Sequence, residues 1–283
     1  MNKTEFLLRL KLQKGVGYVK MLQIATQLDA EEIDLIQLNA LDLPLALREI
    51  CLKAYRDEQA EIIIERIKQQ SEIISFFDDS YPEKLRQIYQ PPLILFARGD
   101  LSLLKKPIMT IVGARAATNY SQEIIQKLVP SLVKQKYIIA SGLAKGVDAM
   151  AHHATLNNNG KTIAVIGNGL NHFYPMQNHF LQEQIIDQGL IISEYLPDTP
   201  PRPYRFPQRN RIISGISEGV IVTEAKEKSG SLITASLALQ ENRDVYAVPG
   251  PITSSLSKGP NQLIEAGATP IVDFEFKKER FDN

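Results

Sequence analysis

The sequence is poor in residues on which many enzymes depend: its 283 residues include one cysteine, four histidines and no tryptophan. A single cysteine, Cys51, excludes an intrachain disulfide and a cysteine-rich zinc site. Its place in an apolar helical stretch predicts a small buried side chain. The histidines, His152, His153, His172 and His179, show no H-E-x-x-H spacing, so we expect no metal site.

Long apolar runs and an excess of either charge are also missing. No run approaches the roughly 18 residues that a membrane-spanning helix needs, and Lys3, Glu5 and Arg9 interrupt the region where a secretory signal would be apolar. We therefore expect a cytoplasmic protein with no membrane partner. Lys plus Arg and Asp plus Glu number 32 each. Any binding to a nucleic acid must then come from a local cationic patch.

The composition changes along the chain and predicts three regions. Residues 1–70 carry Leu and Ile at helical spacing, which indicates a small all-helical domain. The segment GVGYVKML at 15–22 is either a tight helix–helix turn or the phosphate-approaching turn of a helix-hairpin-helix. Residues 71–107 predict a bridging segment with short strands and prolines. Residues 108–283 alternate between strands and helices.

Six apolar runs in the third region predict strands. Continuous apolar runs favour a doubly wound, mainly parallel α/β sheet, because strands covered by helices on both faces need no polar side. We expect one helix to begin near Ser121, with the hydroxyl of this residue as its cap, and another to begin near Ser231. The predicted strands are residues 108–112, 137–140, 162–167, 190–193, 219–223 and 245–248.

Glycine-rich or cationic junctions lie near the ends of these runs. In open α/β sheets ligands bind outside the carboxyl ends of the strands, and helix N-termini with nearby arginines attract phosphate. We therefore expect an extended phosphate-binding surface. The junctions are IVGAR (111–115), SGLAKGVD (141–148), IGNGL (166–170), KSGSLITA (228–235) and FPQRNRII (206–213), the last expected to precede a helix.

Enzymatic alternatives find little support. The first strand is followed by only one glycine of G-x-G-x-x-G, Gly113, and no Walker A loop occurs, so we expect neither a nicotinamide cofactor nor ATP hydrolysis. Glu194 and Glu224 each follow a predicted strand. They could share a pocket for acid–base chemistry, but capping or ion pairing is at least as good an interpretation. Asp148 is expected to orient the SGLAKG loop, and we expect no catalytic residue and no cofactor.

Several long motifs together resemble one family. VGAR, SGLAKGVDAMAH, KTIAVIGNGL, FPQRNRIISGIS, GVIVTEA, SGSLITASLALQENRDVYAVPG and GPNQLIEAGA follow the order and spacing of the DprA/Smf family of DNA-processing proteins, over roughly residues 75–272. The resemblance implies an extended Rossmann-like domain preceded by a SAM-like helical domain. It also implies a homodimer that binds single-stranded DNA and loads RecA during natural transformation, with a competence regulator as a candidate partner.

The resemblance also implies which residues bind DNA. Arg115 would contact a phosphate, loop amides and Lys145 would hold the next one, Tyr174 would stack a base, and the arginines of FPQRNRII would close the pocket. The nucleic-acid-binding candidates are Gly113, Arg115, Ser141, Gly142, Lys145, Gly146, Asn168, Gly169, Tyr174, Asn178, Arg209, Asn210, Arg211, Ser229, Gly230 and Ser231.

At two places the family resemblance gives a less definite expectation. Many family members have a basic residue after the YP dipeptide, whereas this chain has Met176, so one phosphate contact is in doubt. The dimer interface is expected around Leu263 and Ile264, although core packing would explain an apolar edge there equally well.

Two alternatives stay open. Any one of the four arginines between 202 and 211 could instead be solvated or pair with Glu218 or Glu241. The chain could also be a nucleoside monophosphate hydrolase of the lysine-decarboxylase-like Rossmann group. That group carries a PGGxGT loop followed by a catalytic glutamate; KSGSLITASLALQE lacks the double glycine and places Glu241 late.

Overall fold

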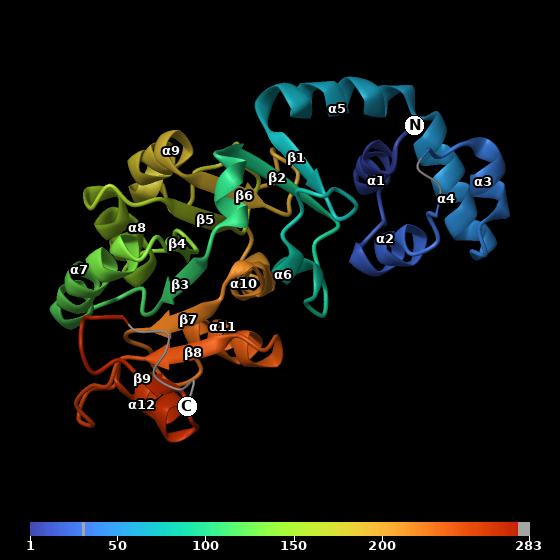
Figure 1. The fold of residues 1–283 in the computed structure, drawn as a ribbon. Coiled ribbons are helices and arrows are strands. Elements are labelled where there is room, and N and C mark those ends of the chain that lie inside the picture. The colour runs from blue at the N-terminus through green and yellow to red at the C-terminus, as the bar shows by residue number, and fades with distance from the viewer. Residues whose placement is uncertain (30–31, 277–283) are drawn as a thin grey trace. The chain divides into compact units, whose positions relative to one another are not determined.

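The computed structural model of the chain describes residues 1–29 and 32–276. It divides into two compact units, Met1–Tyr81 with Pro92–Phe96, and Pro82–Pro91 with the chain from Ala97 onward. The segment expected to bridge two domains, 71–107, contributes residues to both units. Figure 1 shows the helical N-terminal elements in blue and the elements of the second unit from green to red.

The first unit is mainly helical, as residues 1–70 predicted. Glycine is required between its first two helices, because Gly15 has a φ of +80°. Cys51 is buried, and burial raises the pKa of its thiol to about 11. The elements are α1 (Lys3–Leu12), α2 (Tyr18–Ala25), α3 (Leu35–Ala40), α4 (Leu45–Arg56), α5 (Glu58–Gln70) and β1 (Glu72–Ser75).

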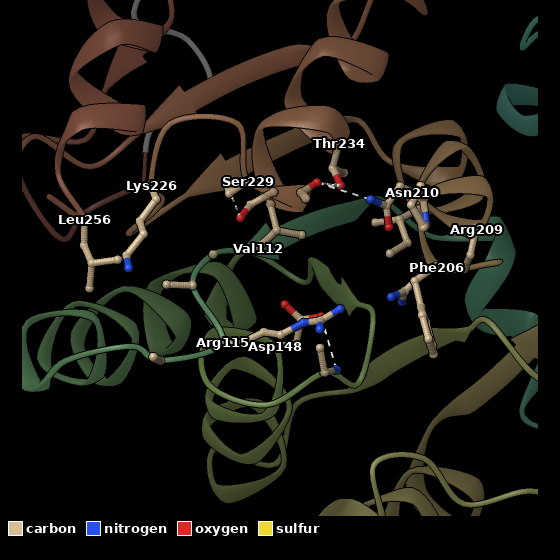
Figure 2. Close-up of a pocket in the computed structure, with 18 residues that line it drawn as sticks. Val112, Arg115, Asp148, Phe206, Arg209, Asn210, Lys226, Ser229, Thr234 and Leu256 are labelled. Atoms are coloured by element: carbon tan, nitrogen blue, oxygen red, sulfur yellow. Dashed lines mark hydrogen bonds between the residues drawn. The ribbon is translucent and has the colours of Figure 1, made fainter. Parts of the chain in front are cut away.

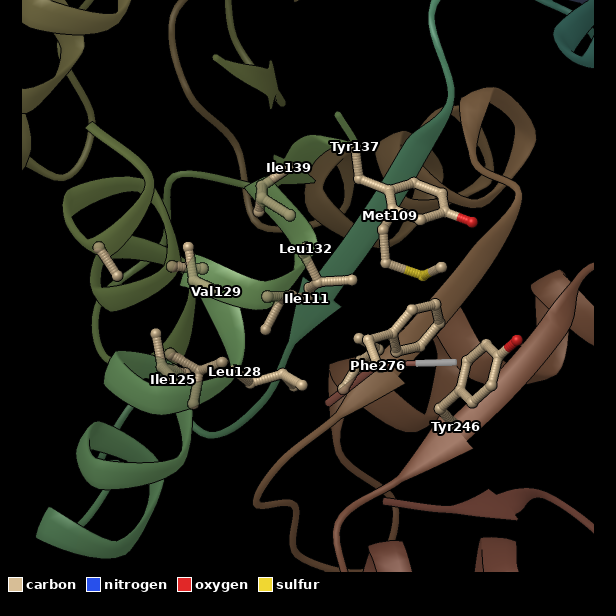
Figure 3. Close-up of a cluster of buried hydrophobic side chains, with 14 residues drawn as sticks. Met109, Ile111, Ile125, Leu128, Val129, Leu132, Tyr137, Ile139, Tyr246 and Phe276 are labelled. Carbon is tan, nitrogen blue, oxygen red and sulfur yellow. The ribbon is translucent and has the colours of Figure 1, made fainter. Parts of the chain in front are cut away.

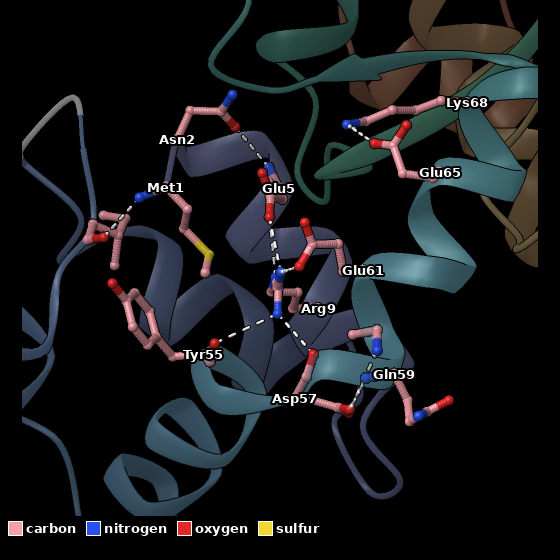
Figure 4. Close-up of polar contacts among 12 residues, drawn as sticks. Met1, Asn2, Glu5, Arg9, Tyr55, Asp57, Gln59, Glu61, Glu65 and Lys68 are labelled. Carbon is pink, nitrogen blue, oxygen red and sulfur yellow. Dashed lines mark hydrogen bonds and ion pairs between the residues drawn. The ribbon is translucent and has the colours of Figure 1, made fainter.

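A buried arginine joins the helices of this unit. Arg9 of α1 donates to the carbonyl oxygen of Asp57 at 2.8 Å, between α4 and α5, and pairs with Glu5 at 3.1 Å (Figure 4). The Asp57 side chain caps α5 by accepting from the backbone N–H of Ala60 at 3.2 Å. Arg9 therefore satisfies orphan carbonyls at the end of α4 that the turn would otherwise leave unpaired.

The second unit contains a parallel sheet. Seven of its strands lie in the order β6-β5-β4-β3-β7-β8-β9, and each neighbouring pair is parallel. The predicted strands are all present, with ends that shift by at most one residue. They are β3 (Ile108–Val112), β4 (Ile138–Ser141), β5 (Thr162–Ile166), β6 (Leu190–Ser193), β7 (Gly219–Val222) and β8 (Asp244–Ala247); β2 (Ile94–Gly99) precedes them and β9 (Thr269–Pro270) follows.

Helices cover both faces of this sheet, which confirms the doubly wound α/β fold. On one face α7 and α8 pack on alternate residues of β3, such as Met109 and Ile111 (Figure 3). On the other face Ala235 and Ala238 of α11 pack against Val220. The helices are α6 (Glu83–Arg86), α7 (Asn119–Lys134), α8 (Val147–Asn157), α9 (His179–Gln188), α10 (Arg205–Ile216), α11 (Gly230–Gln240) and α12 (Lys258–Glu265), with 3-10 turns η1 (Leu101–Lys105) and η2 (Met176–Asn178). No helix among the described residues is long and apolar enough to cross a membrane.

The expected helix starts at Ser121 and Ser231 were wrong by one turn or less. Helix α7 is capped by Thr118, whose hydroxyl accepts from the N–H of Tyr120 at 3.2 Å, while Ser121 is buried and donates to Thr223 at 2.9 Å. Helix α11 begins one residue before Ser231. A hydroxyl in the first helical turn can bond to a neighbouring strand instead of its own helix, and sequence does not distinguish the two.

His152 is buried in α8, and hydrogen bonds place a hydrogen on its Nδ1. The Thr162 hydroxyl donates to the carbonyl oxygen of Ile139 and therefore accepts a hydrogen bond from Nδ1–H of His152, both at 2.6 Å. Among the described residues, Nε2 has no hydrogen-bond partner. Burial, with smaller contributions from His153 and Arg209, lowers the pKa of His152 from 6.5 to about 3.

We expect the free energy of unfolding to fall as the pH drops below 6.5 towards 3, because only the unfolded chain then binds a proton at His152. Because the pKa of His152 is lower in the folded than in the unfolded chain, its contribution to stability is present at a pH above the unfolded pKa and is lost as the pH falls towards the folded pKa. This one group contributes a slope of about 1.4 kcal/mol per pH unit. Urea unfolding measured at neutral and at mildly acidic pH should show a shallower dependence of stability on pH in His152→Asn than in the wild type. Equal slopes in the two proteins would contradict the assignment.

Candidate nucleic-acid interface

The strand order reverses at β3, which pairs with β4 on one side and with β7 on the other. The loops that follow β3 and β7 leave the sheet in opposite directions, so a crevice forms between them. A pocket of about 380 Å³ lies at this point (Figure 2). It is lined by residues that follow β3, β4 and β7 and by residues of α10 and α11. Four of the five predicted phosphate-binding junctions therefore meet at the switch point of the sheet, whereas IGNGL (166–170) contributes no lining residue.

Seven of the sixteen candidates line the pocket, and Figure 2 shows its arrangement. Lys226 and Leu256 lie at one end, Phe206 and Arg209 lie at the other, and Arg115 lies between them. The candidates among its lining residues are Gly113, Arg115, Arg209, Asn210, Ser229, Gly230 and Ser231. The other candidates lie outside the lining.

Two glycines let the loops after β3 and β4 approach each other. A Cβ at Gly113 would lie 2.6 Å from Cγ2 of Val147. Gly146 has a φ of +75°, and its Cβ would lie 2.5 Å from the carbonyl oxygen of Arg115. Larger residues would separate the two loops, so these glycines bring Arg115 to the pocket.

Arg115 and Lys226 supply exposed positive charge. Both side chains line the pocket and are exposed, and among the described residues neither forms an ion pair with a carboxylate. Arg115 also contributes to lowering the pKa of Arg209, as expected for two neighbouring groups of like charge. An anion in the pocket would relieve this repulsion.

The N-terminus of α11 adds hydrogen-bond donors. The first N–H groups of a helix have no partner within it, and they carry partial positive charge. Ser229 is the N-cap and makes no side-chain cap; its hydroxyl lies 3.3 Å from that of Ser231. A Cβ at Gly230 would meet nothing within 4 Å. The space beside this helix start is therefore open to a ligand.

Arg209 has a structural position behind the pocket. It is 5% exposed and donates through Nη1 to the carbonyl oxygen of Val165. Burial lowers its pKa to about 10, although the charge of Asp148 opposes this shift. Burial also raises the pKa of Asp148. Asp148 accepts from the backbone N–H groups of Gly142 at 3.1 Å and Ala144 at 3.3 Å, so its expected role in orienting this loop is confirmed.

Arg211 lies elsewhere, in an ion pair with Glu194 at 2.6 Å, with side chains 15% and 13% exposed. The expectation that FPQRNRII precedes a helix was wrong, because α10 begins at Arg205. Residues two apart on a helix do not share a face, so Arg209 and Arg211 diverge. Glu194 is not one of the two partners, Glu218 and Glu241, that were considered for these arginines.

The two carboxylates considered for acid–base chemistry have structural contacts. Glu194 pairs with Arg211. Glu224 is buried and accepts from the backbone N–H and the hydroxyl of Thr118, both at 2.8 Å. Neither lines the pocket. The interpretation of these residues as an ion-pair partner and a helix-capping carboxylate is confirmed.

Several candidates shape the loops around the pocket. Their buried side chains bond to backbone: Ser141 donates to Ile111 at 2.6 Å, Asn168 to His172 at 2.9 Å, and Asn178 to Leu143 at 3.0 Å. A Cβ at Gly169 would collide with the carbonyl oxygen of Pro197. These contacts hold the backbone of the loops beside the pocket in place. Lys145 is exposed.

Sequence reasoning missed Lys226 and gave Phe206 no individual role. Both line the pocket. Lys226 follows the strand 219–222, and the signal for it would have been the adjacency of β3 and β7. That adjacency cannot be read from one sequence, because parallel neighbours need not be consecutive.

Comparisons with known proteins show the family to which this chain belongs. The family model described as DNA recombination-mediator protein A matches residues 72–281. The DNA processing protein DprA of Streptococcus pneumoniae is 50% identical over 194 residues, covering 69% of this chain and 68% of that protein. A crystal structure of the Streptococcus pneumoniae protein has a TM-score of 0.86 and 38% identity, covering 97% of each chain.

A second solved structure is that of DNA processing protein A from Helicobacter pylori, described in terms of a unique single-stranded DNA binding mode. It has a TM-score of 0.67 and 33% identity, covering 73% of this chain and 93% of that one. The motifs, the fold and these matches agree, and the chain belongs to the DprA/Smf family of DNA-processing proteins, the family of DNA recombination-mediator protein A.

Proposed function

We propose that this protein binds single-stranded DNA in the pocket at the β3–β7 switch point and acts, without catalysing a reaction, as a recombination mediator. The observation that carries the proposal is the convergence of Arg115, Lys226 and the N-terminus of α11 on one open pocket. The guanidinium of Arg115, the ammonium group of Lys226 and the backbone N–H donors of α11 together suit a phosphodiester group. The formal net charge of the chain is zero, so the attraction for DNA has to come from a local cationic site.

The pocket holds the backbone of one strand and does not read base sequence. Its donors are those that contact phosphates, which position a strand without specifying it. The Helicobacter pylori relative, 33% identical, is described by its single-stranded DNA binding. A preference for single strands is expected because separated bases leave the backbone flexible enough to enter a recess.

The proposal extends to partners. We propose that the protein forms a homodimer in the cytoplasm and loads RecA onto the strand it holds during natural transformation. Leu263 is half-buried and packs against the core between α11 and the sheet. Its neighbour Ile264 is therefore the better candidate for a dimer contact. Two pockets on one strand would raise the apparent affinity without new contacts.

The test is a fluorescence-anisotropy titration of labelled oligo-dT and of a duplex of equal length, at low and high salt. We expect the protein to prefer the single strand and its affinity to fall steeply with salt, because bound phosphates release counterions. An affinity that does not change with salt concentration, or no binding by the folded protein, would contradict the proposal. Release of free base from AMP would favour the hydrolase alternative. Faster RecA assembly on the bound strand would support the mediator role.

A further inference from the structure

The pocket at the switch point is larger than one phosphate group requires. Its volume is about 380 Å³, and pockets for small molecules commonly measure about 300–1,000 Å³. One water occupies about 30 Å³ of the liquid, so a phosphate group, which is the size of a few waters, fills only part of this space. The remaining volume is open to a ligand that carries more than a phosphate.

Much of the pocket lining is apolar. Val112 at the end of β3 and Ile213 of α10 line the pocket and are 4% and 1% exposed. Phe206 and Leu256 lie at its opposite ends (Figure 2). An anion gains nothing from these side chains, because they replace none of the hydrogen bonds that it has in water. We therefore expect an uncharged, largely apolar part of a ligand to contact them.

Asp148 supplies a hydrogen-bond acceptor in the same lining. It is 7% exposed, and its Oδ2 accepts from the backbone N–H groups of Gly142 and Ala144. A carboxylate has about four acceptor sites, so Asp148 can accept from a ligand even with Ser141 as a further neighbour. An ionised phosphate has no donor, and the sugars inside a DNA strand carry no hydroxyl because both ester oxygens are linked to phosphate. Asp148 therefore fits a ligand with a hydroxyl group.

The charges of the pocket determine where the phosphate of such a ligand lies. Arg115, Lys226 and the first N–H groups of α11 attract it, whereas the carboxylate of Asp148 repels it. The ligand that meets all these conditions has a phosphate, a sugar with hydroxyl groups and a flat, largely apolar ring. A ribonucleoside 5′-monophosphate has these three parts.

The pocket is poorly equipped to cleave this ligand. Asp148 is the only carboxylate among the described residues that line it. The backbone N–H groups of its loop hold it in place, and it attracts the buried Arg209. Glu241, which the hydrolase alternative would place at the site, accepts from the backbone N–H of Tyr89 at 3.0 Å and lies outside the lining. The site therefore suits binding without hydrolysis.

We propose that the pocket binds a free ribonucleoside 5′-monophosphate, with its phosphate at Arg115, Lys226 and α11 and a ribose hydroxyl donating to Asp148. The nucleotide is a competitive effector, because it occupies the cations that hold a phosphate of the strand. Nucleotide binding stands on the pocket alone, and only the release of DNA rests on the proposed function. A rise in free ribonucleotide then releases single-stranded DNA from the protein.

The experiment titrates the full chain with AMP by calorimetry and then adds AMP to the complex with labelled oligo-dT. AMP should bind and displace the strand. Both 2′,3′-dideoxy-AMP, which lacks the ribose hydroxyls, and inorganic phosphate, which lacks the sugar and the ring, should bind about tenfold more weakly or worse. AMP should be recovered intact, and release of adenine would overturn the inference in favour of the hydrolase.

Asp148→Asn separates the two ligands. It should weaken AMP binding by about tenfold, and its affinity for oligo-dT should be equal to or higher than that of the wild type, because a charge that repels phosphate is lost. Asp187→Asn is the matched control, since Asp187 is exposed on α9 and does not line the pocket. If Asp148→Asn does not fold, the comparison of AMP with dideoxy-AMP on the wild type decides.

Two results would overturn the inference and leave the proposed function intact. One is a wild-type protein that binds oligo-dT but not AMP. The other is equal affinity for AMP, dideoxy-AMP and inorganic phosphate. A wild-type protein that binds AMP but not oligo-dT would instead support the nucleotide site and refute the proposed function.

Discussion

Replacing Gly142 by alanine should destabilise the protein strongly. The new Cβ would lie 2.5 Å from Cζ and Nη2 of Arg209 and closer still to Nη1. Arg209 is buried, so it cannot swing into solvent without leaving the carbonyl oxygen of Val165 and the charge of Asp148. Overpacking and a disturbed buried charge pair together cost roughly 3 kcal/mol. Thermal unfolding should shift down by roughly 6–12 °C.

Gly230→Ala is the matched control for this prediction. Its Cβ would meet nothing within 4 Å, and the residue lies in the first turn of α11. Its stability should equal or slightly exceed that of the wild type, because alanine restricts the unfolded chain more than glycine does. A Gly142→Ala protein as stable as this control would show that Arg209 can move freely. The claim that Arg209 is fixed in its buried position would then be wrong.

Arg115→Ala should weaken binding of oligo-dT by about tenfold or more, since a charge-assisted hydrogen bond to phosphate contributes roughly 1.5–3 kcal/mol. The fold should not suffer. Arg115 is exposed and repels Arg209, so its removal relieves a like-charge interaction. Measured on the same preparation, the Arg115→Ala protein should therefore have a lower affinity for oligo-dT than the wild type, and an equal or slightly higher thermal stability.

Arg211→Ala should show the opposite combination. It leaves Glu194 without its ion-pair partner at a site where both side chains are largely buried, so stability should fall. Its affinity for oligo-dT should stay close to that of the wild type, because Arg211 does not line the pocket. If Arg211→Ala lost as much affinity as Arg115→Ala, the strand would follow a different path from the one proposed.

The sequence predicted the sheet well because burial leaves a direct mark on composition. Strands covered on both faces need no polar side, and β3, β5 and β7 are buried runs that are apolar apart from Thr110 and Thr162. The close loop packing at Gly113 and Gly146 was also foreseeable, since few other residues fit where backbones meet.

Side-chain direction was much less predictable. Arg209 and Arg211 stand in one motif, yet one is buried beneath the pocket and the other pairs with Glu194. The environments of the two side chains differ because of where α10 begins and which elements pack against each face of the helix. Both are features of the tertiary structure. Lys226 was missed for a related reason, because its contribution depends on β7 lying next to β3.

The central claim, that phosphates bind at the β3–β7 switch point, is tested most directly by the salt dependence of oligo-dT binding. The slope of log affinity against log salt concentration counts the phosphates that the protein neutralises. The double variant Arg115→Ala/Lys226→Ala should lower the magnitude of that slope by about 1.4 relative to wild type, or roughly 0.7 for each lost contact. An unchanged slope in the folded double variant would place the phosphates elsewhere and contradict the account.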